Sequence, residues 1–434
     1  MATIDGYVDF NNDADKTINV VTGSTLDINA RIQNGGIDKT GDGTLILSGG
    51  NTFTDDVDVF DGIVRVDNDL GLGAVTGGTN VTSGAQLQLD GVSIGAETLT
   101  INGTGISGDG ALQTVASSGA NSWAGNVNVA SASEIEVSAA SSLAITGNVT
   151  GSGQTLTIES IGDTTLSGTN TLNTLNKTGV GNLTVTTSPN TISTVNVDAG
   201  TFTVGTSNIL NDSLDLNING AGTLVMGGGI NGTIDQLNTS GILDIDGILT
   251  MNGGTISGGS GAGSTGELIL TANNTLNITS DYDFGGTLEL TSDTVLALSG
   301  NGNQIDIGAL KVTGDTVIDF GAGENIELNL GSLEITAGST ITVNNWNQFQ
   351  DLWTTGSFTG GAGAVTIDER DSNTAQITFT GFTPGDTVWL TFDYGSNEIT
   401  VPEPSSYGAL LMTFGLAAAL GVRLAESKTL IGLR

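Results

Sequence analysis

The sequence predicts an all-β fold and, within that class, a right-handed parallel β-helix, in which short strands stack turn upon turn. Three observations support this prediction. Short apolar runs with alternating polar residues recur from about Ile18 to about Val343, mostly 7 to 15 residues apart. Glycine supplies 67 of the 434 residues, whereas proline supplies only 4, so turns are frequent and the chain is not a proline-rich linker. The third observation is an internal repeat.

The repeat has two copies, which begin 138 residues apart. Residues 39–66 read KTGDGTLILSGGNTFTDDVDVFDGIVRV, and residues 177–204 read KTGVGNLTVTTSPNTISTVNVDAGTFTV. They share Lys-Thr-Gly-x-Gly-x-Leu, then an Asn-Thr turn at Asn51 and Asn190, then strands that end in valine. One such unit cannot bury its apolar row alone, so the repeat predicts a stacked solenoid. In the first copy we expect strands at residues 44–47, 57–59 and 63–66.

A β-sandwich is the competing all-β fold. Sandwiches seldom exceed about 200–250 residues as one domain and do not repeat internally. We therefore assign residues 1–340 to a parallel β-helix repeat domain. The longest polar stretch, residues 253–266, is expected to be a protruding loop.

The composition changes near Ile341. Residues 341–400 contain 9 of the 20 aromatic side chains. A solenoid end exposes both a sheet edge and a core, so we expect this segment to form a β capping module rather than an aromatic ligand site.

Residues 401–434 form a distinct tail. An apolar run at 407–422 follows Val401, Pro402, Glu403, Pro404 and Ser405, and Arg423 follows the run. The run predicts a short hydrophobic helix of transmembrane type, although a bilayer core needs about 20 residues. The alternative is a helix packed on the end of the solenoid. The first residues show neither a basic region nor an apolar run, so the chain itself predicts no signal peptide.

Two segments resemble known families. Residues 41–54 (GDGTLILSGGNTFT), the strand at 62–66 and Leu70-Gly71 resemble the autotransporter-associated β-strand repeat of secreted bacterial proteins. The tail resembles a PEP-CTERM sorting signal, and residues 341–400 resemble the preceding module in secreted proteins of Verrucomicrobia-like bacteria. The resemblance implies an extracellular or cell-surface protein of a Gram-negative-type bacterium. It also implies recognition of Pro402-Glu403-Pro404 by an exosortase, with transient membrane insertion of the tail.

Charge and composition exclude several functions. The net charge is −36, from 46 acidic and 10 basic residues, so a nucleic-acid partner is excluded for lack of phosphate-binding side chains. The chain has no cysteine or histidine, which excludes disulfides, thiolate chemistry and the usual zinc sites. The acidity is read as a solvated outer surface, on which Ca²⁺ would bind only non-specifically.

Two acidic patterns resemble parts of known sites. Asp9, Asn11, Asp13 and Asp15 alternate as at the start of a calcium loop, but Ala14 and Val20 occupy the positions that need glycine and glutamate. We expect a polar turn there. Asp244 and Asp246 could share one face as a hydrolytic pair, but solvated pairs of this kind are common.

Catalysis on a β-helix would also need cationic side chains beside the acids. The chain before the tail offers only Arg31, Arg65, Arg370, Lys16, Lys39, Lys177 and Lys311. We therefore expect no catalytic, cofactor-binding or metal-binding residues. The leading hypothesis is an exported structural or adhesive β-solenoid, with extracellular polysaccharide or copies of itself as partner. The alternatives are a polysaccharide-acting lyase or glycosidase and an adhesin like an autotransporter passenger.

Overall fold

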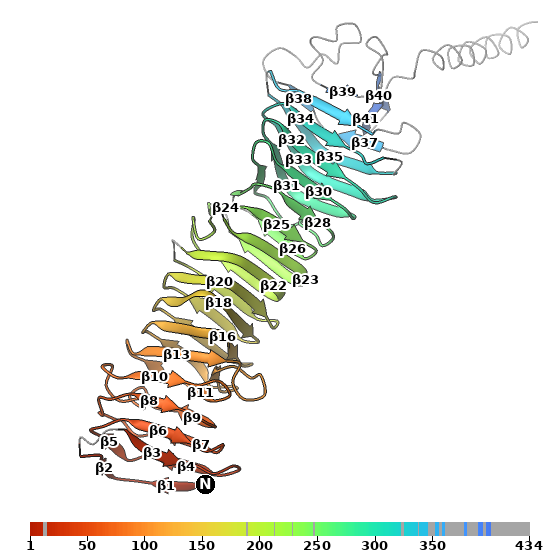
Figure 1. Cartoon of the computed structure of the whole chain (residues 1–434). Helices are drawn as coiled ribbons and strands as arrows, with labels where there is room; N and C mark the ends of the chain where they lie inside the picture. Colours follow the sequence, from red (N-terminus) through yellow and green to blue (C-terminus); the bar gives the residue numbers. More distant parts are fainter. Residues whose placement is uncertain are drawn as a thin grey trace, which may run out of the picture. The chain divides into compact units, whose positions relative to one another are not determined.

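The protein is a parallel β-solenoid. The computed structural model describes residues 1–345, apart from 12–14, 188–189, 212, 228, 246–247, 323–324 and 337, together with the backbone of five strands between 352 and 400. Every regular element among these residues is a β-strand, and parallel strands stack in about 16 turns (Figure 1). The predicted all-β solenoid is confirmed.

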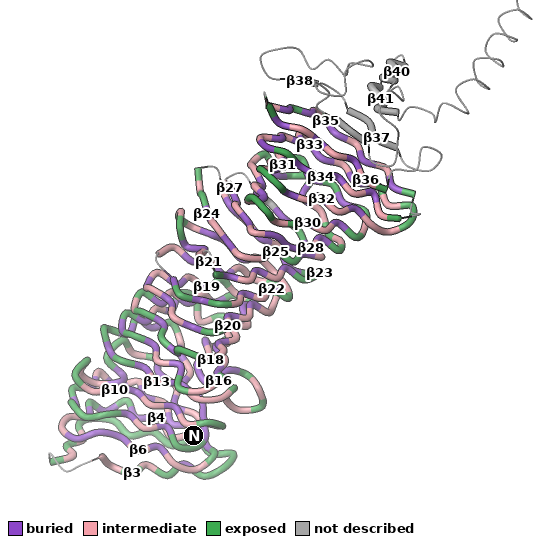
Figure 2. Tube along the Cα trace, turned by 45° about the horizontal axis from the view of Figure 1, so that its top comes forward, coloured by how far each residue is buried: buried purple, intermediate pink, exposed green. Residues whose placement is uncertain are grey.

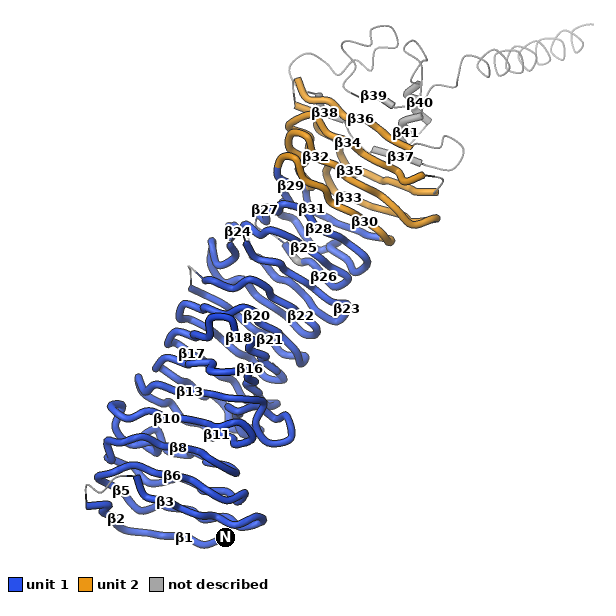
Figure 3. Tube along the Cα trace, viewed as in Figure 1, with its two compact units in different colours: residues 1–271, 282–287 blue, residues 272–281, 288–434 orange. Residues whose placement is uncertain are grey.

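The chain divides into two compact units (Figure 3). Unit 1 comprises residues 1–271 and 282–287, and unit 2 comprises residues 272–281 and 288–434. The domain boundary expected at residue 340 falls within unit 2, and the domain limits given by the sequence stay predictions.

Three columns of parallel strands make up most of unit 1, and we call them faces A, B and C. Face A contains β3 (Lys16–Asn19), β6 (Ile37–Thr40), β8 (Val57–Val59), β10 (Gly78–Val81), β13 (Thr98–Gly103), β16 (Val127–Val137), β18 (Val149–Ser160), β20 (Asn170–Thr178) and β22 (Thr191–Val204). The last four are long enough to turn a corner and continue on face B.

Face B also contains separate strands in the turns before and after these four long strands. Its other strands are β1 (Ala2–Ile4), β4 (Thr25–Ile28), β7 (Thr44–Leu47), β9 (Ile63–Val66), β11 (Gln86–Leu89), β14 (Leu112–Thr114), β23 (Asp215–Met226), β25 (Gln236–Thr239) and β28 (Gly254–Ile256). The three strands expected in the first repeat copy are thus confirmed as β7, β8 and β9.

Face C is the third column of unit 1. Besides the ends of β22 and β23, it contains β12 (Ser93–Ile94), β15 (Gly119–Trp123), β17 (Ser141–Ile145), β19 (Asp163–Leu166), β21 (Asn182–Val185) and β26 (Ile242–Ile245). Two shorter series pair in parallel beside these faces: β2 (Tyr7–Asp9) with β5 (Arg31–Gln33), and β24 (Asn231–Ile234) with β27 (Ile248–Met251) and β29 (Glu267–Leu270).

The core follows from the alternation of side chains along each strand. On face B the register places one inward residue of each turn above the next, in the row Leu45, Val64, Leu87, Leu112, Ile135 and Ile158, and every member is completely buried. Figure 2 shows the resulting alternation of buried and partly exposed positions along the strands. Burying each such side chain contributes about 1.5–3 kcal/mol, which a single turn could not obtain by itself.

Glycine permits close stacking of the corners. A Cβ on Gly147 would lie 1.9 Å from the carbonyl oxygen of Gly125, and one on Gly168 would lie 2.1 Å from that of Gly147. The lack of room for a Cβ also explains why the protruding loop predicted at residues 253–266 is wrong in part. Residues 254–256, expected in a protruding loop, form strand β28 against β25, because Gly254 can approach the carbonyl of Leu237.

Unit 2 has the same construction. One column contains β30 (Thr275–Ile278), β32 (Thr294–Leu298), β34 (Thr316–Asp319), β36 (Ile341–Asn344) and β39 (Ile377–Phe379). The other contains β33 (Gln304–Val312), β35 (Glu327–Ile335), β37 (Leu352–Thr355) and β38 (Phe358–Gly360). Strand β31 (Tyr282–Leu290) joins residues of both units.

The predicted capping segment is described only in its strands. Four of them, β36 to β39, continue the parallel columns, whereas β40 (Trp389–Asp393) and β41 (Ser396–Thr400) form an antiparallel hairpin, in which β41 pairs with β37. The tail at 401–434 lies outside the described residues, and so does its predicted helix. Among the residues that are described, no helix has the length and apolarity to cross a membrane.

Candidate functional site

The conserved lysine of the two repeat copies is an internal corner residue. Lys39 and Lys177 are completely buried, in inward positions that aliphatic side chains occupy in neighbouring turns. Lys177 Nζ donates to the carbonyl oxygens of Thr178, Gly179 and Ala199 at 2.6, 2.7 and 3.1 Å.

Lys39 repeats the arrangement. Its Nζ donates to Thr40 O, Gly41 O and Asp61 O at 3.1, 2.6 and 3.0 Å. Burial lowers the pKa of both lysines, that of Lys177 to about 8. The repeat motif therefore binds two turns together, with each ammonium group held by backbone carbonyls inside the solenoid.

The asparagine of each repeat copy is also buried. Asn51 Oδ1 accepts a hydrogen bond from Ile32 N at 2.8 Å, and Asn190 Oδ1 accepts one from Asn170 N at 2.8 Å. In both cases the donor belongs to the preceding turn, 19 or 20 residues earlier. The Asn-Thr turns recognised in the sequence are thus internal braces of the solenoid.

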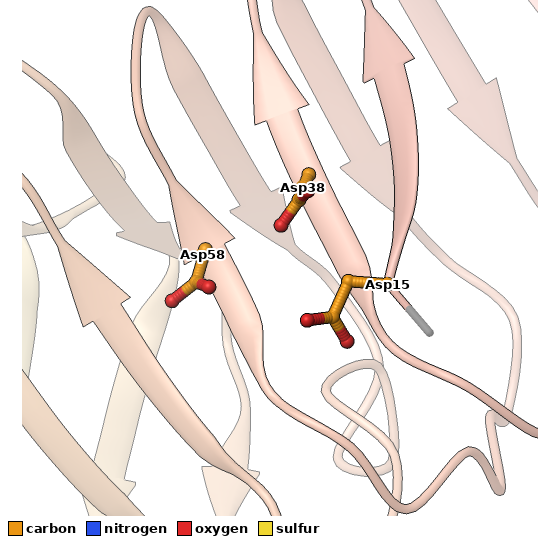
Figure 4. A group of neighbouring side chains, drawn as sticks. All are labelled: Asp15, Asp38 and Asp58. Atoms are coloured by element: carbon orange, nitrogen blue, oxygen red, sulfur yellow. The ribbon is translucent and has the colours of Figure 1, made fainter. Parts of the chain in front are cut away.

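A group of three carboxylates on face A is the acidic site that the sequence did not predict (Figure 4). Asp38 on β6 and Asp58 on β8 are direct neighbours in the parallel register, and Asp15 immediately precedes β3. One carboxylate oxygen of each lies within 4.8 Å of the others. Gly36 makes room for this arrangement, since a Cβ there would lie 2.1 Å from Asp15 Oδ1.

The electrostatics of this acidic triad are unfavourable without a counter-charge. The pKa of Asp15 is raised, first by burial and then by the negative charges of Asp38 and Asp58. Carboxylate oxygens at this separation are of the type that hard divalent cations prefer. Three exposed or half-buried carboxylates are also common without any ion, so the triad defines a cation-attracting patch and no more.

Of the carboxylates in the calcium-loop pattern, Asp9 and Asp15 are described, and they do not share a carboxylate cluster. Asp9 instead accepts hydrogen bonds from Asn34 Nδ2, Gln33 Nε2 and Asn11 N, at 2.7, 2.9 and 2.8 Å. These bonds lower its pKa. Asp13 lies outside the described residues, and Asp15 belongs to the triad.

The other candidate residues of a catalytic site do not converge where the structure describes them. Arg65 pairs with Asp90, Arg31 donates to Thr52, and Lys311 Nζ lies 2.6 Å from Glu289 Oε2. Arg370, Asp246 and the side chain of Asp244 lie outside the described part of the chain. The predicted sorting residues, Val401, Pro402, Glu403, Pro404 and Arg423, also lie outside it.

Glu97 is a buried carboxyl group that sequence reasoning missed. It is 2 % exposed and accepts a hydrogen bond from Thr79 Oγ1, while its backbone carbonyl accepts one from Trp123 Nε1 at 2.8 Å. Burial raises the pKa of Glu97 to about 7, against the opposing effect of the Thr79 bond. An isolated glutamate between turns gives no sequence signal for such a position.

The outer surface of face B carries a ladder of asparagine side chains. They come from β20, β22, β23 and β25, in register in four successive turns: Asn176, Asn196, Asn217 and Asn238. The Nδ2 of each of the last three donates to the Oδ1 of the preceding asparagine, at 2.8 Å from Asn196, 2.8 Å from Asn217 and 3.0 Å from Asn238. Asn176 Nδ2 donates to Thr157 Oγ1 at 3.4 Å. We call this row the amide ladder.

A second outward row runs beside the amide ladder, two residues earlier on each strand. It consists of Thr155, Thr174, Thr194, Asp215 and Gln236. Thr157 and Thr255 occupy the two ends of the ladder row itself. From β18 to β28 these two rows therefore present amides, hydroxyls and one carboxylate with the regular spacing of the strands.

No protein-family model, curated protein or solved structure matches the chain. The fold and the outer surfaces define it as a parallel β-solenoid protein. Its resemblance to autotransporter-associated repeats and to PEP-CTERM proteins stays a prediction.

Proposed function

We propose that this protein is an exported structural or adhesive β-solenoid of the cell surface or extracellular matrix of a Gram-negative-type bacterium. The observation that carries the proposal is that inward and outward side chains have different roles. The repeat residues Lys39, Asn51, Lys177 and Asn190 are used internally, whereas the outward rows form long, regular polar surfaces. Such surfaces suit binding over many turns better than chemistry at one point.

The tail supplies the route to the surface in this proposal. Pro402-Glu403-Pro404 would be recognised by an exosortase-type enzyme while the apolar run is transiently inserted in the membrane, with Arg423 on the cytoplasmic side. The partners would be extracellular polysaccharide or further copies of the chain, without nucleic acid. No resident cofactor is required, and cations would bind only non-specifically to the acidic surface.

A polysaccharide-acting lyase or glycosidase receives less support. The two buried lysines are held by backbone carbonyls, Arg65 forms an ion pair with Asp90, and Lys311 forms one with Glu289. We therefore propose a non-enzymatic role. An autotransporter passenger would share the solenoid, but the apolar run after residue 406 resembles a sorting tail rather than the alternating strands of a translocator.

Export and tail processing can be tested together in the producing organism. We expect intact mass of the surface and medium fractions to show a product ending near residues 401–405. A variant with Pro402→Ala, Glu403→Ala and Pro404→Ala should stay full-length in the membrane fraction. Pro384→Ala, a proline change outside the motif, should be processed normally. Wild-type protein found only in the cytoplasm, or at the surface with Arg434 still present, would contradict the proposed sorting.

A further inference from the structure

The two outward rows that include the amide ladder offer a ligand little charge. The two outward rows described above comprise eleven residues over β18, β20, β22, β23, β25 and β28, and Asp215 is the only charged one. None of the eleven is basic. Acidic side chains border this surface, with Glu134 preceding the ladder row and Glu159 beside it.

The amide ladder keeps hydrogen-bonding groups for a ligand. An asparagine amide has two N–H donors, and its oxygen has two acceptor sites. In Asn196 and Asn217 the ladder uses one donor and one acceptor position of each side chain, on the sides that face the neighbouring turns. One N–H and one oxygen lone pair per turn are therefore left to point away from the ladder.

The ladder also fixes the geometry of those groups. Its hydrogen bonds hold each amide plane in place before a ligand arrives, so binding would cost little side-chain entropy. Neighbouring strands lie about 4.8 Å apart, and outward residues two apart on one strand lie about 6.8 Å apart. The turn spacing is close to the length that one sugar unit adds to an extended chain.

We propose that the amide ladder and the row beside it bind a neutral, linear polysaccharide that runs across successive turns. Hydroxyl groups both donate and accept, so they match the amide and hydroxyl groups of this surface. With one carboxylate, Asp215, and no basic side chain, these rows give little counter-charge to an ionic glycan. An acidic glycan would also be repelled by the bordering carboxylates and the net charge of −36. This inference rests on the proposed adhesive function and names its partner and surface.

The mode of binding follows from this chemistry. Because no ion pair or bridging cation is involved, affinity should change little between low and high salt and in the presence of EDTA. This requirement separates the proposal from capture of acidic polysaccharide through divalent cations on the acidic triad.

The test uses the purified full-length chain, with amorphous cellulose and glucomannan as neutral probes and alginate as the acidic one. Wild-type protein should be retained by at least one neutral probe and not by alginate. The double variant Asn196→Asp and Asn217→Asp keeps the side-chain shape but places two carboxylates in the ladder. It should bind at least tenfold more weakly.

The matched control is Asn128→Asp and Asn182→Asp, which makes the same chemical change at outward positions of faces A and C. It should bind as wild type does, and circular dichroism should show both variants folded. A milder variant, Asn196→Thr and Asn217→Thr, serves if the first does not fold, and should also weaken binding.

Three outcomes of the binding assays would overturn the proposal. They are wild-type protein that binds neither neutral probe, equal loss of binding in the control, and binding that EDTA abolishes. Sedimentation of the same variants shows whether the surface instead joins copies of the chain, since a ladder variant that only dissociates an oligomer would also refute glycan binding. Glycan binding by purified protein does not depend on export, so failure of the sorting experiment is distinguishable from failure here.

Discussion

Replacing Glu97 by glutamine should remove a large pH dependence from the stability of unit 1. The wild-type carboxyl group is buried, with Thr79 Oγ1 as its donor and Asp56 as a nearby negative charge. Glutamine has nearly the same shape and can still accept the Thr79 hydrogen bond. The substitution therefore changes the ionisation of the site and little else.

The magnitude follows from the pKa of Glu97, which is about 7 in the folded protein and 4.5 for an ordinary glutamate. The folded state binds the proton more tightly, so this group contributes stability that is fully present below pH 4.5. That stability is lost as the pH rises through 7. The shift corresponds to about 3 kcal/mol, at about 1.4 kcal/mol per pKa unit. Glu97→Gln should therefore gain about 3 kcal/mol relative to wild type between pH 4 and pH 8.

The assay is urea unfolding of both proteins at a series of pH values, because the difference between them cancels the other titrating groups. Carbon-13 NMR of labelled glutamate side chains should show a carboxyl titration near pH 7 that the variant lacks. Thr79→Val is the companion variant. It removes the hydrogen bond that lowers the pKa of Glu97, so the midpoint should move upward. A stability difference that stays flat from pH 4 to pH 8 would refute the assignment.

Three further predictions concern the corners and the acidic triad. Lys177→Met should lower the unfolding free energy by about 2–4 kcal/mol in urea melts. The variant loses three hydrogen bonds from a charged donor, and the relief of the desolvation that lowers the pKa of Lys177 offsets about 3 kcal/mol of that loss. As a control, Lys311→Met, at a partly exposed lysine, should cost under about 1 kcal/mol. Gly147→Ala should lower the melting temperature or prevent folding, since its Cβ would overlap the Gly125 carbonyl, whereas Gly50→Ala, with no atom within 4 Å, should be nearly neutral. Asp38→Asn should return the pKa of Asp15 toward its usual value in an NMR titration, and an unchanged midpoint would contradict the coupling.

The fold could be predicted because one physical rule recurs in every turn. Leu45 and Leu47 alternate with polar or half-exposed positions, and both are completely buried in the strand that the sequence predicts. Glycines at corners and an internal repeat complete the argument for stacking. None of this requires knowledge of which turn contacts which.

The internal use of Lys39 and Lys177 could not be predicted from the same pattern. A lysine next to a glycine turn suggests a solvated corner, and only the register shows its ammonium group under the carbonyls of two turns. The register also shows that the two copies occupy different faces. Lys39 lies on face A, with the following strand β7 on face B, whereas Lys177 lies on face B, with β21 on face C.

The difference between spacing in the sequence and position in the register also explains why the acidic triad was not predicted. Asp15, Asp38 and Asp58 are 23 and 20 residues apart, so no fixed period connects them. Turns differ in length because loops at the corners differ, while strands keep their register. Side chains meet on the outer surface according to that register and not according to spacing in the sequence.

The packing of the core does not require the amide ladder, because its asparagines occupy outward positions. Its members lie 20, 21 and 21 residues apart, yet the same outward column also accommodates Thr157, Thr255 and Glu134. The inward neighbours Leu175, Val195, Leu216 and Leu237 are buried whatever stands outside. Outward positions are therefore chemically free in a way that inward ones are not. Four successive asparagines in one outward column make this part of face B the surface on which binding is most directly testable.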